Sequence, residues 1–220
     1  MPSGDEQPNL GKAGASARRE HDRRAANRER AIREKHPRLG GAILALSNEP
    51  TSQQAWERGA VGEERVAESL IRHAAPHVVF LHDRRIPGSK ANIDHIAVAP
   101  SGIWIIDAKR YKGRVEVRKP LFGQPKLLIA GRDRSKLADG LGHQVQLVND
   151  AIVSTAPEVP VYGAFAFVDA DLPVLSRLNF SGYLLLYPRQ LAKRLSERGP
   201  VPVDRIPELA RHLATSFPSA

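Results

Sequence analysis

The 220-residue sequence contains no cysteine, which excludes disulfide bonds, cysteine-ligated zinc and catalysis by a thiol. Among its eight histidines, His82 and His95 could meet on neighbouring strands, but no recognised zinc spacing occurs. No apolar run approaches the roughly 20 residues that cross a membrane. The N-terminus also lacks the apolar stretch of a secretory signal, so we expect a cytoplasmic protein without a transmembrane segment. The phosphate loop of NTPases and the Gly-x-Ser-x-Gly elbow of serine hydrolases are missing as well.

Acidic residues are the minority among the charged ones. The chain carries 33 Lys and Arg against 24 Asp and Glu, a net charge of +9. Such an excess favours polyanionic partners, nucleic acid first and an anionic membrane second. A hydrophobic content of 41% with 26% charged residues is typical of one globular domain with an extension.

Residues 1–52 are predicted to form a basic N-terminal extension and linker that is partly disordered or helical. The first 15 or so are rich in Gly, Pro, Ser and Ala, which favours disorder. From Ser16 to Arg38, nine Lys or Arg stand against four Asp or Glu, with almost no apolar stripe. This pattern predicts a solvated helix or tail. A grip on nucleic-acid phosphates and attachment to a membrane surface are the alternatives.

Residues 53–220 are predicted to form the folded domain. Hydrophobic periodicity gives helices and strands in the order helix, antiparallel strands, helix, strand, strand, helices, which predicts a mixed α/β architecture. The expected helices are Glu63–His73, Ser135–Ser154, Pro188–Arg198 and Val203–Thr215, and the expected strands outside the central hairpin are Val78–His82, Val115–Val117, Lys126–Ala130, Val161–Val168 and Tyr183–Tyr187. No function is predicted for residues beyond about 170.

The central stretch of this domain is Asn92–Lys109, where β-branched apolar residues flank a Pro-Ser-Gly turn. Side chains alternate along a strand, so Asp107 and Lys109 share one face. If the loop has two residues, Asp94 lies opposite Asp107, with Cβ atoms about 5 Å apart. Two carboxylates facing each other in an apolar sheet repel. A bound divalent cation would relieve the repulsion, and a salt bridge to Lys109 is the simpler alternative.

Three segments of the chain resemble the motifs of one known family. They are the run from Gly59 to Leu70 with Gly62-Glu63-Glu64, the run Ile93-Asp94-His95, and Ile106-Asp107-Ala108-Lys109 followed by Tyr111-Lys112-Gly113. In this order and spacing they are similar to the nuclease-related domain, over residues 56–170. That family is placed in the PD-(D/E)XK superfamily of metal-dependent nucleases. The resemblance implies a restriction-endonuclease-like fold, in which helices flank a mixed sheet.

The resemblance also implies a role for each polar residue. Asp94 and Asp107 would bind one or two Mg²⁺ ions, or Mn²⁺ in their place, and Glu63 would ligate through water or complete a second site. The ion would polarise the scissile phosphate and lower the pKa of a water molecule. Lys109 would orient that water and stabilise developing charge. Gln144 would orient substrate or a metal-bound water, although such a residue is more often an ordinary polar neighbour.

Two features leave room for other interpretations. Glu64 is the alternative to Glu63 and lies about 100° around the helix, and either could be an ordinary first-turn acid that favours the helix dipole. Asp107 stands where the superfamily often has glutamate, and Ile93 precedes Asp94 where a proline is common. Neither departure removes a chemical group that the reaction needs.

Basic residues around the hairpin are predicted to contact a nucleic-acid backbone: Arg84, Arg85, Lys90, Lys112 and Arg114. Exposed basic residues in loops more often only keep a protein soluble. The expected function is a metal-dependent nuclease that hydrolyses phosphodiester bonds, with DNA as the expected substrate. The alternative is a non-catalytic or weakly catalytic nucleic-acid-binding or regulatory module on the same fold.

Overall fold

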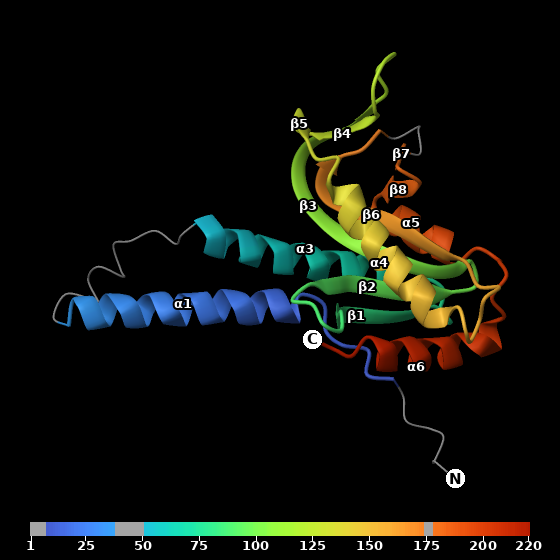
Figure 1. Ribbon diagram of the computed structural model, residues 1–220, viewed down its shortest axis with the longest axis horizontal. Helices are drawn as coiled ribbons and strands as arrows, with labels where there is room; N and C mark the ends of the chain where they lie inside the picture. Colours follow the sequence, from blue (N-terminus) through green and yellow to red (C-terminus); the bar gives the residue numbers. More distant parts are fainter. Residues whose placement is uncertain (1–7, 38–50, 174–177) are drawn as a thin grey trace, which may run out of the picture.

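A mixed β-sheet forms the middle layer of the protein (Figure 1). The structure is a computed structural model that describes residues 8–37, 51–173 and 178–220, with only the backbone for residues 51–56. The strands run in the order β1-β2-β3-β6-β8-β7, and β4 joins β3 and β5 outside this path. Their bounds are β1 Val79–Arg85, β2 Asn92–Ala99, β3 Gly102–Arg118, β4 Lys126–Ile129, β5 Arg132–Asp133, β6 Val161–Asp171, β7 Leu178–Phe180 and β8 Tyr183–Leu186.

Helices cover both faces of this sheet. The described α-helices are α1 (Ala15–Lys35), α3 (Thr51–His73), α4 (Leu137–Ile152), α5 (Pro188–Leu195) and α6 (Ile206–Ser216), and a short 3-10 turn at Val203–Arg205 precedes α6. Side chains of α4 and α6 share one core with the sheet, and those of α3 and α5 share the other. The predicted α/β fold, a mixed sheet flanked by helices, is confirmed. None of the described helices is long and apolar enough to cross a membrane.

Alternation along the central strands divides the apolar side chains between these two cores. Ile103 and Ile105 of β3 lie in the core beneath α4 and α6. Trp104 and Ile106 lie in the core beneath α3 and α5. Buried strands with apolar side chains on both faces are expected where helices cover both sides of a sheet.

The β2–β3 hairpin has the predicted two-residue loop. Its ladder runs from His95 opposite Ile106 to Ala99 opposite Gly102. One further step along this antiparallel register places Asp94 opposite Asp107. The predicted register, which decides whether the two carboxylates share a face, is therefore confirmed.

The third strand is longer than expected, because β3 continues through the segment predicted to be a separate strand at Val115–Val117. It is 17 residues long and pairs with β6 first and with β4 farther along. The register with β6 shifts between Arg110 and Gly113. Gly113 has a φ of +92°, a conformation that side chains other than glycine rarely adopt. The glycine therefore bends the strand at a bulge instead of ending it.

Helix α3 begins at Thr51, well before the predicted start at Glu63. The expected domain boundary between residues 52 and 53 therefore falls in its first turn. Two glycines lie inside this helix although glycine disfavours helices. At Gly62 a Cβ atom would come within 2.9 Å of the Arg110 Cβ. This glycine lets the helix approach β3 closely, and it directly precedes Glu63.

The N-terminal segment packs on the domain, and the prediction of disorder up to about residue 15 is wrong for residues 8–14. The amide of His82 in β1 donates to the carbonyl of Leu10, with an N···O distance of 2.7 Å. Helix α1 runs beside α3, and both project from the body of the molecule (Figure 1). On the other side, the amide of Arg85 donates to the carbonyl of Pro218. Both ends of the chain thus cover the edge strand β1, which would otherwise offer unpaired backbone groups.

Candidate active site

The five side chains predicted to be catalytic line one open cleft. Its volume is about 890 Å³, and α3, β2, β3 and α4 each contribute residues to its wall. The wall is formed by Arg58, Gly59, Glu63, Asp94, Asp107, Ala108, Lys109, Arg110, Tyr111, Lys112, Arg132, Arg134, Gln144 and Asp169. Segments far apart in the sequence therefore bring the five predicted residues together.

The hairpin carboxylates lie at the bottom of this cleft. The amide of Ala108 donates to Asp94 Oδ2 across the hairpin, with an N···O distance of 2.9 Å. Asp107 Oδ1 forms an ion pair with the Lys109 ammonium, two residues along the same strand face. Burial raises the pKa of Asp94 well above its usual range, and the nearby charges of Glu63 and Asp107 raise it further. The positive charge near Asp94 is thus too small to offset its burial and the neighbouring carboxylates.

Lys109 is the cation in contact with these carboxylates. Its side chain is only 20% exposed. Burial by itself lowers the pKa of the ammonium, but the charges of Asp107 and Asp94 and the hydrogen bond to Asp107 outweigh that effect and raise the pKa. The residue is therefore a protonated, hydrogen-bonding cation at neutral pH.

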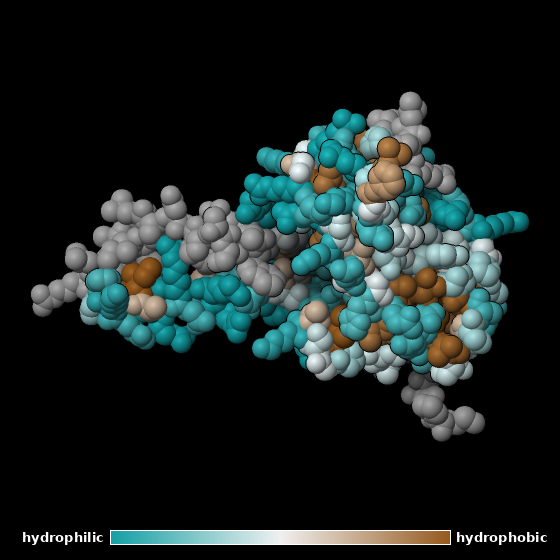
Figure 2. Space-filling model, turned by 45° about the horizontal axis from the view of Figure 1, so that its top comes forward, coloured by the Kyte–Doolittle hydropathy of each residue, from teal (hydrophilic) through white to brown (hydrophobic). Residues whose placement is uncertain are grey.

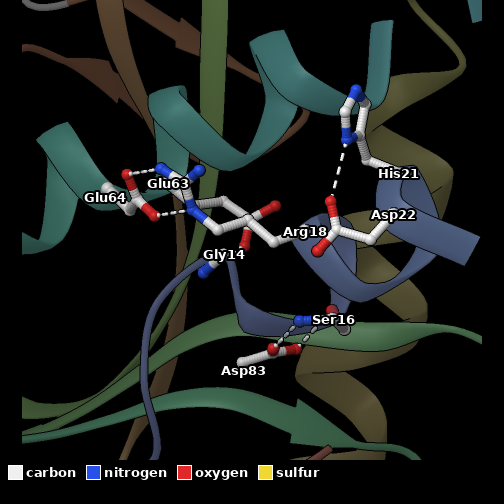
Figure 3. Close-up of polar contacts among 8 residues, drawn as sticks. All are labelled: Gly14, Ser16, Arg18, His21, Asp22, Glu63, Glu64 and Asp83. Atoms are coloured by element: carbon white, nitrogen blue, oxygen red, sulfur yellow. Dashed lines mark hydrogen bonds and ion pairs between the residues drawn. The ribbon is translucent and has the colours of Figure 1, made fainter. Parts of the chain in front are cut away.

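Glu63 reaches the cleft from α3, while Glu64 turns away from it. The amide of Gly14 donates to Glu63 Oε2 at 3.1 Å. Burial raises the pKa of Glu63 to about 7, and the charge of Asp83 is the next cause. Glu64 instead forms a two-pronged ion pair with Arg18, with both N···O distances at 2.5 Å (Figure 3). Glu64, the alternative to Glu63, thus holds helix α1 and does not line the cleft.

Asp83 is a buried carboxylate beside this site to which the sequence analysis gave no role. It lies in β1 with a φ of +48° and is only 2% exposed. Its oxygens accept hydrogen bonds from the Ser16 amide at 2.6 Å and the Ser16 hydroxyl at 2.7 Å (Figure 3). The Asn92 side chain donates a third, at 2.9 Å. The carboxylate therefore satisfies backbone and side-chain donors at the start of α1. No local pattern reveals such a contact, because it joins residues 67 positions apart.

Gln144 projects from α4 at the edge of the cleft. Its Nε2 donates to the carbonyl of Asn92, with a long N···O distance of 3.3 Å. Three apolar side chains on one face of this helix, Leu141, Val148 and Ile152, are all at 1% exposure or less. These buried residues hold α4 against the sheet, and Gln144 therefore lies beside the start of β2.

Arg84 does not face solvent, and its predicted contact with a phosphate backbone is wrong. Strand β1 extends through Arg84, and the side chain is completely buried. Its guanidinium donates to the carbonyls of Phe217 at 2.7 Å, Asn9 at 2.8 Å and Ala214 at 3.1 Å. Arg84 thus ties the N-terminal segment and the end of α6 to β1.

The other four basic residues of that prediction are exposed: Arg85, Lys90, Lys112 and Arg114. Only Lys112 among them lines the cleft. Further basic residues in the cleft wall escaped prediction: Arg58, Arg110, Arg132 and Arg134. Arg110 is held by Asp169, which also pairs with Arg65, each at 2.8 Å. The guanidinium of Arg134 lies over the ring of Tyr111 at 5.7 Å.

His82 and His95 form a buried pair and not a metal site. Their Nδ1 atoms are 2.9 Å apart, so one ring donates a proton to the other. Burial lowers the pKa of His82 to about 4 and that of His95 well below its usual value. Nε2 of His95 is buried without a hydrogen-bond partner. If Nε2 carried the proton, its N–H group would be buried without an acceptor. The favoured tautomer therefore has the proton on Nδ1 of His95, which donates it to His82.

The donor set of the cleft fits a hard divalent cation with water in its shell. Three carboxylates, Glu63, Asp94 and Asp107, face one ammonium, Lys109, so the fully ionised group carries a net charge of −2. Within the described part of the chain, no three His, Asp or Glu side chains stand close enough to hold a metal ion by themselves. Mg²⁺ commonly takes one or two carboxylates and keeps several waters, so Asp94 and Asp107 could bind it directly and Glu63 through water.

Comparison with known proteins agrees with this geometry. The family model of the nuclease-related domain matches residues 58–168, just over half of the chain, and this range includes the five predicted catalytic residues. This family lies in the PD-(D/E)XK-like nuclease superfamily. No curated protein and no solved structure matches the chain. On the family match and the fold, the chain belongs to the nuclease-related domain family.

Proposed function

We propose that this protein is a metal-dependent nuclease that hydrolyses phosphodiester bonds in DNA. The observation that carries the proposal is the convergence of three carboxylates and one lysine on an open cleft with basic residues on its rim. Carboxylates with raised pKa values at the bottom of a cleft are more frequent at functional sites than elsewhere. The pattern favours catalysis over a purely structural ion pair, because a single ammonium leaves two negative charges uncompensated.

Asp94 and Asp107 would hold Mg²⁺ or Mn²⁺ directly, and Glu63 would hold it through water. A cation bound there supplies Lewis-acid polarisation of the phosphate and a lowered pKa for a water molecule. Without it, the pKa of Glu63 is about 7, so this residue exchanges a proton near neutral pH.

Lys109 supplies positive charge where the phosphate becomes more negative. Asp107 accepts a hydrogen bond from its ammonium and so limits the directions in which the side chain can point. A cation already oriented in a partly dry cleft stabilises developing charge without reorganising. Gln144, held by the carbonyl of Asn92, would orient the substrate or the attacking water.

The test compares cleavage by the full chain with Mg²⁺, Mn²⁺ or a chelator. Plasmid and single-stranded DNA are the substrates, and Asp107→Asn and Lys109→Met are the variants. We expect metal-dependent cleavage by the wild type and a loss of at least about a hundredfold in either variant. Lys193→Met, an exposed lysine on α5, is the matched control and should cleave normally. Calorimetric titration with Mg²⁺ gives a second readout, and Asp107→Asn should abolish the binding signal.

Two results would overturn the proposal. Cleavage that persists in both variants would place the reaction elsewhere or reveal a contaminating enzyme. No cleavage by the wild type with either metal, together with equal DNA binding by wild type and Asp107→Asn, would identify a nucleic-acid-binding module on the same fold.

A further inference from the structure

A β-ribbon that rises from the cleft has a larger excess of positive charge than any of the described helices. Residues 110–134, called the basic ribbon here, comprise the outer half of β3, the strands β4 and β5 and the turns between them. They carry eight Lys or Arg against two Asp or Glu, a net charge of +6. Figure 1 shows the ribbon projecting from the body of the molecule, above the sheet.

The base of the ribbon is anchored in the core. Val115, Leu127 and Ile129 are at most 2% exposed and belong to the core shared with α4 and α6. Val117 of β3 pairs with Leu127 of β4, so the ladder continues outward from this base. The ribbon therefore continues the strand that carries Asp107 and Lys109. Nine residues separate Lys109 from Arg118, a distance of at most about 30 Å along the strand.

The tip of the ribbon carries two apolar side chains that no described residue covers. Leu121 is 97% exposed and Phe122 is 92% exposed. The chain has six phenylalanines, and the other five are at most 7% exposed, so Phe122 is a clear exception. Figure 2 shows a small hydrophobic patch among hydrophilic atoms in the upper part of the molecule, over the end of the ribbon. Pro120 and Pro125 flank the tip and restrict its backbone.

Within the described part of the chain, Arg118 and Lys119 next to the tip form no ion pair. Arg118 and Lys126 are direct partners across the two strands. Like charges at opposed positions destabilise a β-ribbon. The nearest acid is Asp133, whose carboxylate lies 3.5 Å from the Lys126 ammonium. Lys119 adds a third basic residue, so the apolar tip is surrounded by positive charge that a polyanion would satisfy.

We propose that the basic ribbon binds duplex DNA and that Leu121 and Phe122 insert between base pairs. The inference rests on the nucleic-acid substrate proposed for the cleft. Basic side chains contact phosphates, and apolar wedges such as Phe and Leu unstack base steps in proteins that bend DNA. Because the reach of the ribbon is fixed, the inserted step lies at a constant distance from the cleaved bond.

The experiment measures binding of the full chain to a duplex oligonucleotide that carries 2-aminopurine, in chelator so that no cleavage occurs. Fluorescence of this base rises when it is unstacked. The double variant Leu121→Ser/Phe122→Ser should lose the fluorescence rise and roughly five- to a hundredfold in affinity. The control is Val203→Ser, which removes a half-exposed apolar side chain outside the ribbon, in the 3-10 turn before α6. This variant should behave as the wild type. Arg118→Ala should lower the slope of log affinity against log salt by about one.

Three results would overturn the inference. The first is a tip variant that binds and unstacks the duplex as the wild type does. The second is a tip variant that loses affinity only for single strands. Alternatively, the tip would be needed for sedimentation with vesicles of anionic lipid and not for DNA binding, which would identify a membrane contact. Cleavage of plasmid by the same proteins in Mg²⁺ separates the two proposals. If the wild type unstacks the duplex through the tip but never cleaves it, the ribbon proposal stands and the nuclease proposal is refuted.

Discussion

Replacing Arg84 by methionine should destabilise the protein and leave its affinity for DNA unchanged. The guanidinium donates to three carbonyl oxygens, from the N-terminal segment and from the end of α6. Methionine fills the space of the aliphatic stem but supplies no donor. Each carbonyl left without a partner in a buried position costs about 1–3 kcal/mol.

The net loss is smaller than the sum of three such costs. The bond to Phe217 is buried, whereas those to Asn9 and Ala214 are only partly buried, so water can replace the lost donor there. Burial also lowers the pKa of the guanidinium, which shows that its charged form is partly desolvated, and the variant recovers that cost. We therefore expect a loss of about 3 kcal/mol, or roughly 6–12 °C in the melting temperature.

The assay is thermal and urea unfolding of Arg84→Met beside Arg85→Met, followed by DNA binding at low temperature. Arg85 is the exposed neighbour, and its variant should change stability by less than about 0.5 kcal/mol. A phosphate contact by Arg84 predicts the reverse pattern, with weaker binding, a smaller salt slope and unchanged melting. Observing that pattern would refute the buried arrangement of the guanidinium.

Three further predictions concern the site and its surroundings. Because the folded-state pKa of Asp94 is raised, its contribution to stability is full at low pH and is lost as pH rises. Asp94→Asn should therefore stabilise the metal-free protein at pH 8 in urea unfolding, and an unchanged midpoint would contradict this. The pKa of His82 is lowered to about 4, so its contribution to stability is full above the unfolded-state pKa and is lost as pH falls. Stability should fall by up to about 3 kcal/mol between pH 6.5 and 4, and unfolding of His82→Gln, which still faces His95, should show a flatter pH dependence over that range. Ser16→Ala removes one bond to Asp83 and should cost about 1 kcal/mol, seen as faster hydrogen exchange in α1 with unchanged exchange in the central sheet; equal rates would contradict it.

The sequence was sufficient for the hairpin because local rules decide its register. β-branched residues, a Pro-Ser loop and strict alternation place Asp94, Asp107 and Lys109 on one face before any distant contact is known. The choice of Glu63 over Glu64 as the residue that faces the cleft rested on the family pattern, and the structure shows its physical basis. Gly62 lets α3 approach β3 closely, and the next residue then reaches the cleft.

Sequence reasoning failed where a residue's role depends on partners far along the chain. Arg84 lies in a run of basic residues that suggests a solvated loop, but its guanidinium meets carbonyls at positions 9, 214 and 217. The N-terminal segment was expected to be disordered because its composition is polar and small. Its order comes from the carboxylates of Asp83 and Glu63, which no local pattern connects to it. The strand expected at Val115–Val117 is part of β3, which continues through the irregularity at Gly113 and pairs with β4, a strand distant from the hairpin.

One strand joins the two proposed activities of this protein. β3 carries Asp107 and Lys109 near its middle, and its outer half is one side of the basic ribbon. The cleft is acidic at its base, with a net charge of −2 when ionised, while the ribbon carries +6. A DNA backbone would therefore be drawn to the ribbon and the basic rim of the cleft, and repelled by the carboxylates at the base of the cleft when no metal is bound. Binding should need no metal, whereas approach of the phosphate to Asp107 should require the cation that offsets the negative charge. This separation predicts that a chelator abolishes cleavage but leaves most of the DNA affinity, and loss of both together would argue against it.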